Sequence, residues 1–144
     1  MKKKPSRFVT CLVIFMCLIG LTACGSRQLI QPEAEEEPLS RTEFTDRIEN
    51  FFEHNPLKAN KPSQFLIHLT DLSDGSPIEK AEVTLTIHPS GGAETGKIKA
   101  RVGKVTGIYV ADVAIAKPGN YNIEFHVRNA KLDEHMPLKD FKVE

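Results

Sequence analysis

A period of two in the apolar residues constrains the fold of this chain more than any other feature of its sequence. Four segments alternate apolar and polar side chains: "SQFLIHLT" (63–70), "AEVTLTIH" (81–88), "YNIEFHVR" (121–128) and "DFKVE" (140–144). Successive side chains of a β-strand point to opposite faces of its sheet. Each segment is therefore predicted to be a strand that buries one face.

Further strand candidates and the turns between them indicate the architecture. The candidates are "IENFFEH" (48–54), "GKIKARV" (96–102) and "GIYVADVAIA" (107–116), and Pro or Gly marks reversals at 60–63, 71–77, 89–92 and 117–120. No long stretch has a helical period. About seven short strands within residues 46–144 predict an all-β fold, an antiparallel β-sandwich of immunoglobulin-like type. Tyr121, which follows a Gly-containing turn, fits the tyrosine corner of such a fold.

The first 23 residues have the composition of a secretory signal peptide. Four basic residues within the first seven positions precede a mostly apolar stretch, 8–21, and small residues then lead to Cys24. The apolar stretch is shorter than the roughly 20 residues that a membrane-spanning helix prefers. An uncleaved membrane anchor of the same topology is the alternative.

Leu21, Thr22, Ala23 and Cys24 resemble the lipobox of bacterial lipoproteins. The resemblance implies that a signal peptidase recognises Leu21, Thr22 and Ala23 and cleaves before Cys24. It also implies a diacylglycerol thioether on the Cys24 thiol and an acyl chain on the new amino group. Two or more acyl chains anchor a protein stably, whereas one binds only marginally. We therefore expect a membrane-bound protein of the cell envelope with no cofactor other than this covalent lipid.

The other cysteines, Cys11 and Cys17, would leave with the signal peptide, so the mature chain would have no free thiol and no disulfide. Gly25 and Ser26 differ from the aspartate that the resemblance associates with retention in the inner membrane. In a bacterium with two membranes we expect the outer membrane, with the protein facing the periplasm.

Residues 24–45, which begin with the lipidated cysteine, are predicted to be a flexible acidic linker. They hold clustered glutamates, two prolines and no hydrophobic period. Without the signal peptide, the chain has 15 basic and 19 acidic residues, a net charge of −4. No basic patch or aromatic-studded basic stripe is present, so nucleic acid is not an expected partner.

The candidate catalytic and metal-binding patterns are weak. Five histidines lack any recognised ligand spacing, and His135 with Met136 is the best candidate pair for a metal ion. The "DLSDGSPIE" stretch (71–79) lacks the third acidic position and the final glutamate of a calcium loop. The glycines of "SGGAETGK" (90–97) precede a predicted strand and not the helix that a phosphate loop needs. No nucleophile motif is present, and we do not expect an enzyme.

Several short stretches resemble one known domain. They are "KPSQF" (61–65), "HLT" (68–70), "DLSDGSPI" (71–78), "GIY" (107–109) and "PGNY" (118–121). Together they are similar to the FixH-like or YtkA-like β-sandwich found near the N-terminus of some periplasmic adaptor subunits of RND-type efflux pumps, notably heavy-metal exporters. The resemblance covers residues 47–144.

Adaptor subunits continue into a lipoyl domain, a helical hairpin and a β-barrel, whereas this sequence ends at Glu144. The resemblance therefore implies a lipid-anchored accessory module that binds an envelope partner, with an efflux component as one candidate. The alternative is a lipoprotein that presents copper or a similar cation through His and Met side chains.

Overall fold

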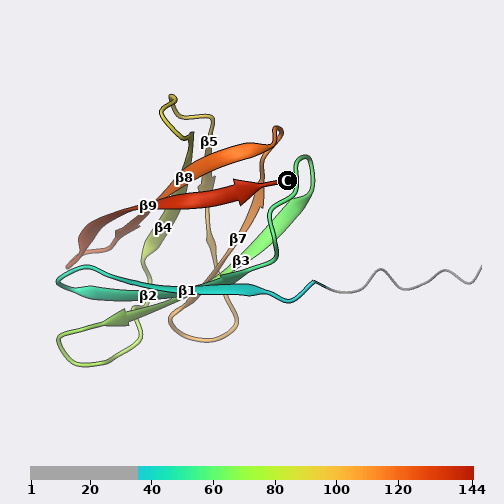
Figure 1. Cartoon of the computed structure of the whole chain (residues 1–144). Coiled ribbons are helices and arrows are strands. Elements are labelled where there is room, and N and C mark those ends of the chain that lie inside the picture. Colours follow the sequence, from blue (N-terminus) through green and yellow to red (C-terminus); the bar gives the residue numbers. More distant parts are fainter. Residues whose placement is uncertain (1–35) are drawn as a thin grey trace, which may run out of the picture. The chain divides into compact units, whose positions relative to one another are not determined.

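The structure, a computed structural model, describes residues 36–144 and contains strands without helices in that range (Figure 1). The strands are β1 (Leu39–Phe44), β2 (Ile48–His54), β3 (Pro62–Asp71), β4 (Glu82–Pro89), β5 (Gly96–Lys99), β6 (Arg101–Val102), β7 (Ile108–Ala114), β8 (Gly119–Arg128) and β9 (Asp133–Val143). Within these residues the structure has no helix with the length and hydropathy needed to span a bilayer.

The strands form two antiparallel sheets that pack face to face as a β-sandwich. The first sheet has the order β1-β2-β3-β7-β6 and the second has the order β5-β4-β8-β9. The orders β2-β3-β7-β6 and β4-β8-β9 match strands A-B-E-D and C-F-G of an immunoglobulin domain, with β5 in the place of C′. The predicted immunoglobulin-like sandwich is thus confirmed, with nine strands in residues 36–144 in place of about seven.

The core lies between the sheets and is built from the alternate residues that the sequence pattern selects. Phe52 and Phe65 of the first sheet and Phe125 of the second are fully buried. The ring centroids of Phe52 and Phe125 lie 4.9 Å apart, across the interface between the sheets. Every buried apolar residue of this core falls between Ile48 and Val143. Residues 36–144 therefore carry a complete core of their own within one compact unit, and we expect them to fold when they are produced separately.

Two buried tyrosines tie connections to the sheets. The hydroxyl of Tyr121 donates a hydrogen bond to the carbonyl of Lys117 at 2.9 Å, which confirms the predicted tyrosine corner. The Tyr109 hydroxyl donates to the carbonyl of Ile78 at 2.9 Å and accepts from the amide of Ala81 at 3.0 Å. Because Tyr109 belongs to β7, it fastens the segment that carries the chain from the first sheet into β4 of the second.

The structure places a strand inside the range predicted as linker. Residues 39–44 form β1, which pairs with β2 along its whole length, so the linker prediction for residues 24–45 is corrected at its C-terminal end. Exposed Leu39 and Phe44 explain why the pattern hides this strand, since β1 is an edge strand held by backbone pairing more than by an apolar face.

The predicted strand "GKIKARV" is divided between the two sheets. The chain leaves β5 of the second sheet at buried Ala100 and continues as β6 of the first sheet. The final strand is longer than predicted, because β9 begins at Asp133 and pairs with β8 from there.

One irregularity interrupts the β8–β9 pairing. The register shifts between Tyr121 and Ile123, where β9 has one residue more than β8, and Asp140 adopts a positive φ of 68°. Before this bulge Met136 and Leu138 face the core, and after it Phe141 and Val143 do. The bulge therefore exchanges the faces of β9 partway along the strand.

Candidate metal centre

The β8–β9 hairpin brings together polar side chains on the outer face of the second sheet. In its register His126 of β8 lies directly opposite His135 of β9. The turn between the strands is fixed by the Asn129 side chain, whose Oδ1 accepts hydrogen bonds from the amides of Lys131 and Leu132 at 2.8 and 2.9 Å. This closed turn sets the register that aligns the two histidines.

His126, Asp133 and His135 form the candidate centre. The two imidazole rings stack with centroids 4.0 Å apart and planes inclined by 16°. His126 Nε2 lies 2.6 Å from Asp133 Oδ1, and His135 Nε2 lies 3.9 Å from the same oxygen. One potential ligand atom from each of the three residues lies within 4.8 Å of the others. The cluster is open to solvent, with the His135 side chain 55% exposed.

Carboxylates determine which histidine nitrogens are available. The hydrogen bond from His126, together with its charge, holds the pKa of the Asp133 carboxyl below its ordinary value. An ionised carboxylate only accepts, so the short contact makes His126 Nε2 the donor. On the other side of the pair, His135 Nδ1 donates to Glu124 Oε1 at 2.7 Å. In neutral His135 this bond leaves the lone pair on Nε2, which lies 3.9 Å from Asp133 Oδ1.

This arrangement has the components of a metal site with two histidines and one carboxylate. A metal ion bonded to nitrogen and oxygen at about 2.1 Å in tetrahedral geometry separates its ligand atoms by roughly 3.4 Å. The separations of 2.6 and 3.9 Å bracket that value, and the two stacked imidazole rings would have to turn for both nitrogen lone pairs to face one ion. Glu124 would support His135 from behind, as carboxylates commonly do for metal-bound histidines. Three protein ligands would leave further coordination positions to water.

The structure separates the pair that sequence reasoning proposed. His135 points to solvent, whereas the neighbouring Met136 is only 4% exposed and lies in the core. Its sulfur accepts a contact from Asn50 Nδ2 at 3.7 Å. Because adjacent residues of a strand face opposite sides of the sheet, His135 and Met136 cannot share an ion without breaking the strand. The predicted pairing is corrected accordingly, and His126 takes the place of Met136.

Sequence reasoning missed His126 because the last strand was expected to begin only near residue 140. The signal that could have found the pair is a hairpin: "HVRNAKLDEH" places two histidines symmetrically about a polar turn. Once both flanks are assigned as strands, the two histidines become cross-strand neighbours.

The remaining histidines lie elsewhere in the sandwich. His54 is buried against Phe65, with ring centroids 4.4 Å apart, and burial lowers its pKa. His68 lies on the outer face of the first sheet in edge contact with Phe51. His88 lies on the same outer face of the second sheet as His126. It lies four residues along β4 from Thr84, the residue that pairs with His126.

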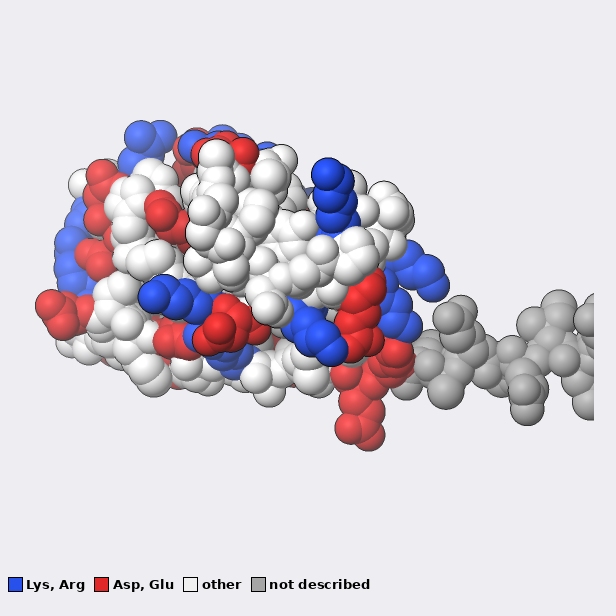
Figure 2. Space-filling view, turned by 45° about the horizontal axis from the view of Figure 1, so that its top comes forward, with Lys and Arg blue, Asp and Glu red and all other residues white. Residues whose placement is uncertain are grey.

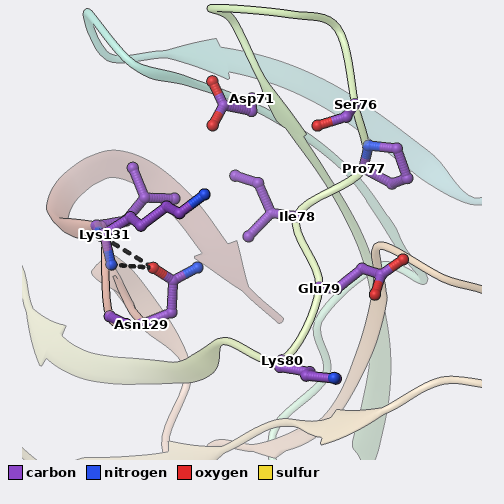
Figure 3. A pocket seen from close by; sticks show the side chains of 10 residues that line it. Asp71, Ser76, Pro77, Ile78, Glu79, Lys80, Asn129 and Lys131 are labelled. Atoms are coloured by element: carbon purple, nitrogen blue, oxygen red, sulfur yellow. Dashed lines mark hydrogen bonds between the residues drawn. The ribbon is translucent and has the colours of Figure 1, made fainter.

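A pocket of about 310 Å³ lies beside the same hairpin turn (Figure 3). The turn around Asn129 and Lys131 forms one wall, and the segment from Ser76 to Lys80 forms the other. Asp71 and Glu79 contribute negative charge and the two lysines contribute positive charge. Acidic and basic residues are likewise interspersed over the face seen in Figure 2. This mixture favours neither an anion nor a cation in the pocket, unlike the His-Asp cluster on the hairpin.

The predicted lipidation site, Cys24, and the predicted recognition residues Leu21, Thr22 and Ala23 lie outside the described residues. Comparison of this chain with family models, with curated proteins and with solved structures gave no match.

Proposed function

We propose that this chain is a lipid-anchored, non-catalytic module of the bacterial cell envelope that binds a transition-metal ion. The observation that carries the proposal is the cross-strand pair of His126 and His135 beside Asp133. Imidazole and carboxylate are common ligands of transition metals, and a paired hairpin holds them in place before the ion arrives. Solvent exposure suits an ion that is taken up and passed on.

The signal-peptide pattern and the LTAC sequence support the anchored location. In a bacterium with two membranes, the protein would face the periplasm from the outer membrane. Metal handling also agrees with the resemblance to domains of heavy-metal efflux adaptors, and an efflux component is the partner class that we propose.

Lipid attachment is tested by Cys24→Ser in cells fed a labelled fatty acid. The variant should incorporate no label and should accumulate as the uncleaved precursor, which mass spectrometry distinguishes from the mature chain. Normal processing and labelling of the variant would refute the anchor.

Metal binding is tested by isothermal titration of residues 36–144, a segment without cysteine. We expect a dissociation constant of about 10 μM or tighter for at least one divalent transition metal ion. His126→Ala and His135→Ala should each weaken it at least tenfold, by roughly 1.4 kcal/mol. His88→Ala is the matched control, since His88 lies on the same outer face roughly 13 Å away along β4. No binding at 10 μM by the unaltered domain would refute metal handling.

A second function, docking of a protein partner, is favoured by the outer face of the first sheet. Half-buried Phe51, Leu66 and Val110 lie on adjacent strands of this face, and Glu53 pairs directly with Leu66. A partner surface with apolar side chains flanked by Lys or Arg would match both features.

Docking is tested by a photo-crosslinking residue placed at position 66 in intact cells. We expect a discrete product that is absent when the crosslinker is at half-buried Asn122, on the outer face of the second sheet, and that disappears with Glu53→Lys. Identification of a transport component in the product would support the efflux association. A product that persists unchanged with Glu53→Lys would refute docking at this face.

A further inference from the structure

Ligand chemistry at the hairpin distinguishes between oxidation states of copper. Cu(I) prefers the soft sulfur of cysteine or methionine, whereas imidazole and carboxylate suit Cu(II), Ni(II) and Zn(II). Residues 36–144 contain one sulfur-bearing side chain, Met136. It adjoins His135 in sequence but is buried on the other face of β9, against Asn50.

We infer that the site takes Cu(II), or another divalent ion that prefers nitrogen and oxygen, and not Cu(I). This inference rests on the proposed function and adds to it the class of ion. The ion would be bound by His126 Nε2, His135 Nε2 and an Asp133 oxygen. Among divalent ions of the first transition row, copper gives the most stable complexes with such ligands, so Cu(II) should bind more tightly than Ni(II) or Zn(II).

Glu124 is the positioning residue of this site. Its hydrogen bond to His135 Nδ1 presents Nε2 as the binding nitrogen before the ion arrives. On the His126 side, Nε2 donates its hydrogen to Asp133, so Nε2 can bind an ion only after this proton has moved to Nδ1 of the same ring.

The ion class is tested on residues 36–144 by titration with Cu(II) and, under anaerobic reduction, with Cu(I) against a chromogenic chelator. We expect Cu(II) to bind at least tenfold more tightly than Zn(II), with a Cu(II) spin-resonance spectrum of nitrogen and oxygen ligation that His126→Ala and His135→Ala alter. Cu(I) should not compete with the chelator. His88→Ala should leave each result unchanged.

Different outcomes separate the two proposals. Cu(I) bound through the same histidines more tightly than Cu(II) would overturn the inferred ion class and leave metal handling intact. Failure of every ion to bind would overturn the proposed function itself. Cu(II) bound equally by the domain and by both histidine variants would overturn the assignment of the site.

The role of Glu124 has its own readout. Glu124→Ala should weaken Cu(II) binding about tenfold, whereas Glu124→Gln, which retains an acceptor oxygen, should restore most of the affinity. In the Zn(II)-bound domain, ¹⁵N chemical shifts should identify Nε2 as the metal-bound nitrogen of His135 and Nδ1 as protonated. Equal affinity in all three proteins, or metal bound at Nδ1, would contradict this role.

Discussion

The Tyr109 hydroxyl bonds two backbone groups, whereas the Tyr121 hydroxyl bonds one, and Tyr109→Phe tests what this difference contributes to stability. The substitution keeps the ring in the core and removes one oxygen. Tyr109 is 1% exposed, and its hydroxyl satisfies two buried backbone groups, the Ala81 amide and the Ile78 carbonyl. Both of these buried groups would lose this partner.

The expected loss of stability depends on how many buried backbone groups lose their hydrogen-bond partner. A buried polar group left without its partner costs about 1–3 kcal/mol, and carbonyl groups tolerate the loss better than amides. Tyr109→Phe should therefore lower the free energy of unfolding by about 2–3 kcal/mol. Tyr121→Phe removes a single hydrogen bond, to the carbonyl of Lys117 in a partly exposed turn, and should cost about 1 kcal/mol.

Urea denaturation of residues 36–144, monitored by far-UV circular dichroism, measures both variants. The midpoint should fall further for Tyr109→Phe, with an unchanged dependence of the unfolding free energy on urea. If Tyr109→Phe costs no more than Tyr121→Phe, the Tyr109 hydroxyl does not fasten the connection between the sheets, and the reasoning is refuted.

Two further changes in stability are expected from single positions. Gly107→Ala should lower the free energy of unfolding by about 2–3 kcal/mol in urea denaturation, because φ is +78° there and an added Cβ would lie 2.5 Å from Pro77 Cβ. Gly75 has a φ of +72° but open space around it, so Gly75→Ala should lower it by only about 1 kcal/mol. Equal losses in the two variants would contradict the steric argument. Burial lowers the pKa of His54 below its ordinary 6.5, so the unfolded chain takes up this proton at a higher pH than the folded chain does. The free energy of unfolding should therefore fall as pH drops below about 6.5, until the folded-state pKa is passed. Unfolding midpoints of His54→Phe measured from about pH 7 to pH 5 should decline less steeply than those of the unaltered domain, and parallel curves would count against this assignment.

Most of the fold could be predicted from the sequence because burial of one strand face leaves a direct trace in alternating residues. Ile67, Leu85 and Phe125 lie on the core side of their strands, as the pattern indicates. The alternating pattern does not reveal a strand that is held by backbone hydrogen bonds and buries few side chains. The β1 strand has too few buried residues to show a period, and at Ala100 the chain changes sheets without a break in alternation.

The candidate centre was less predictable because it depends on register. His135 could be singled out by residue type, but its partner is nine residues away and is defined only when the turn at Asn129 closes. The prediction for Met136 was wrong because neighbouring residues of a strand point to opposite faces of the sheet. Knowing that β9 begins at Asp133 would have corrected both errors.

The bulge in β9 keeps apolar side chains of both halves of this strand in the core. On the turn side, the loop around Asn129 and the core-facing Met136 and Leu138 hold His126 opposite His135. Beyond the bulge, Phe141 and Val143 pack in the core. Removing one residue at Asp140 would turn Phe141 and Val143 to the outer face, and one residue added to the turn would face one histidine away from the other. The length of the turn thus determines whether the two histidines face each other, and the extra residue of the bulge determines whether the last residues of β9 stay in the core.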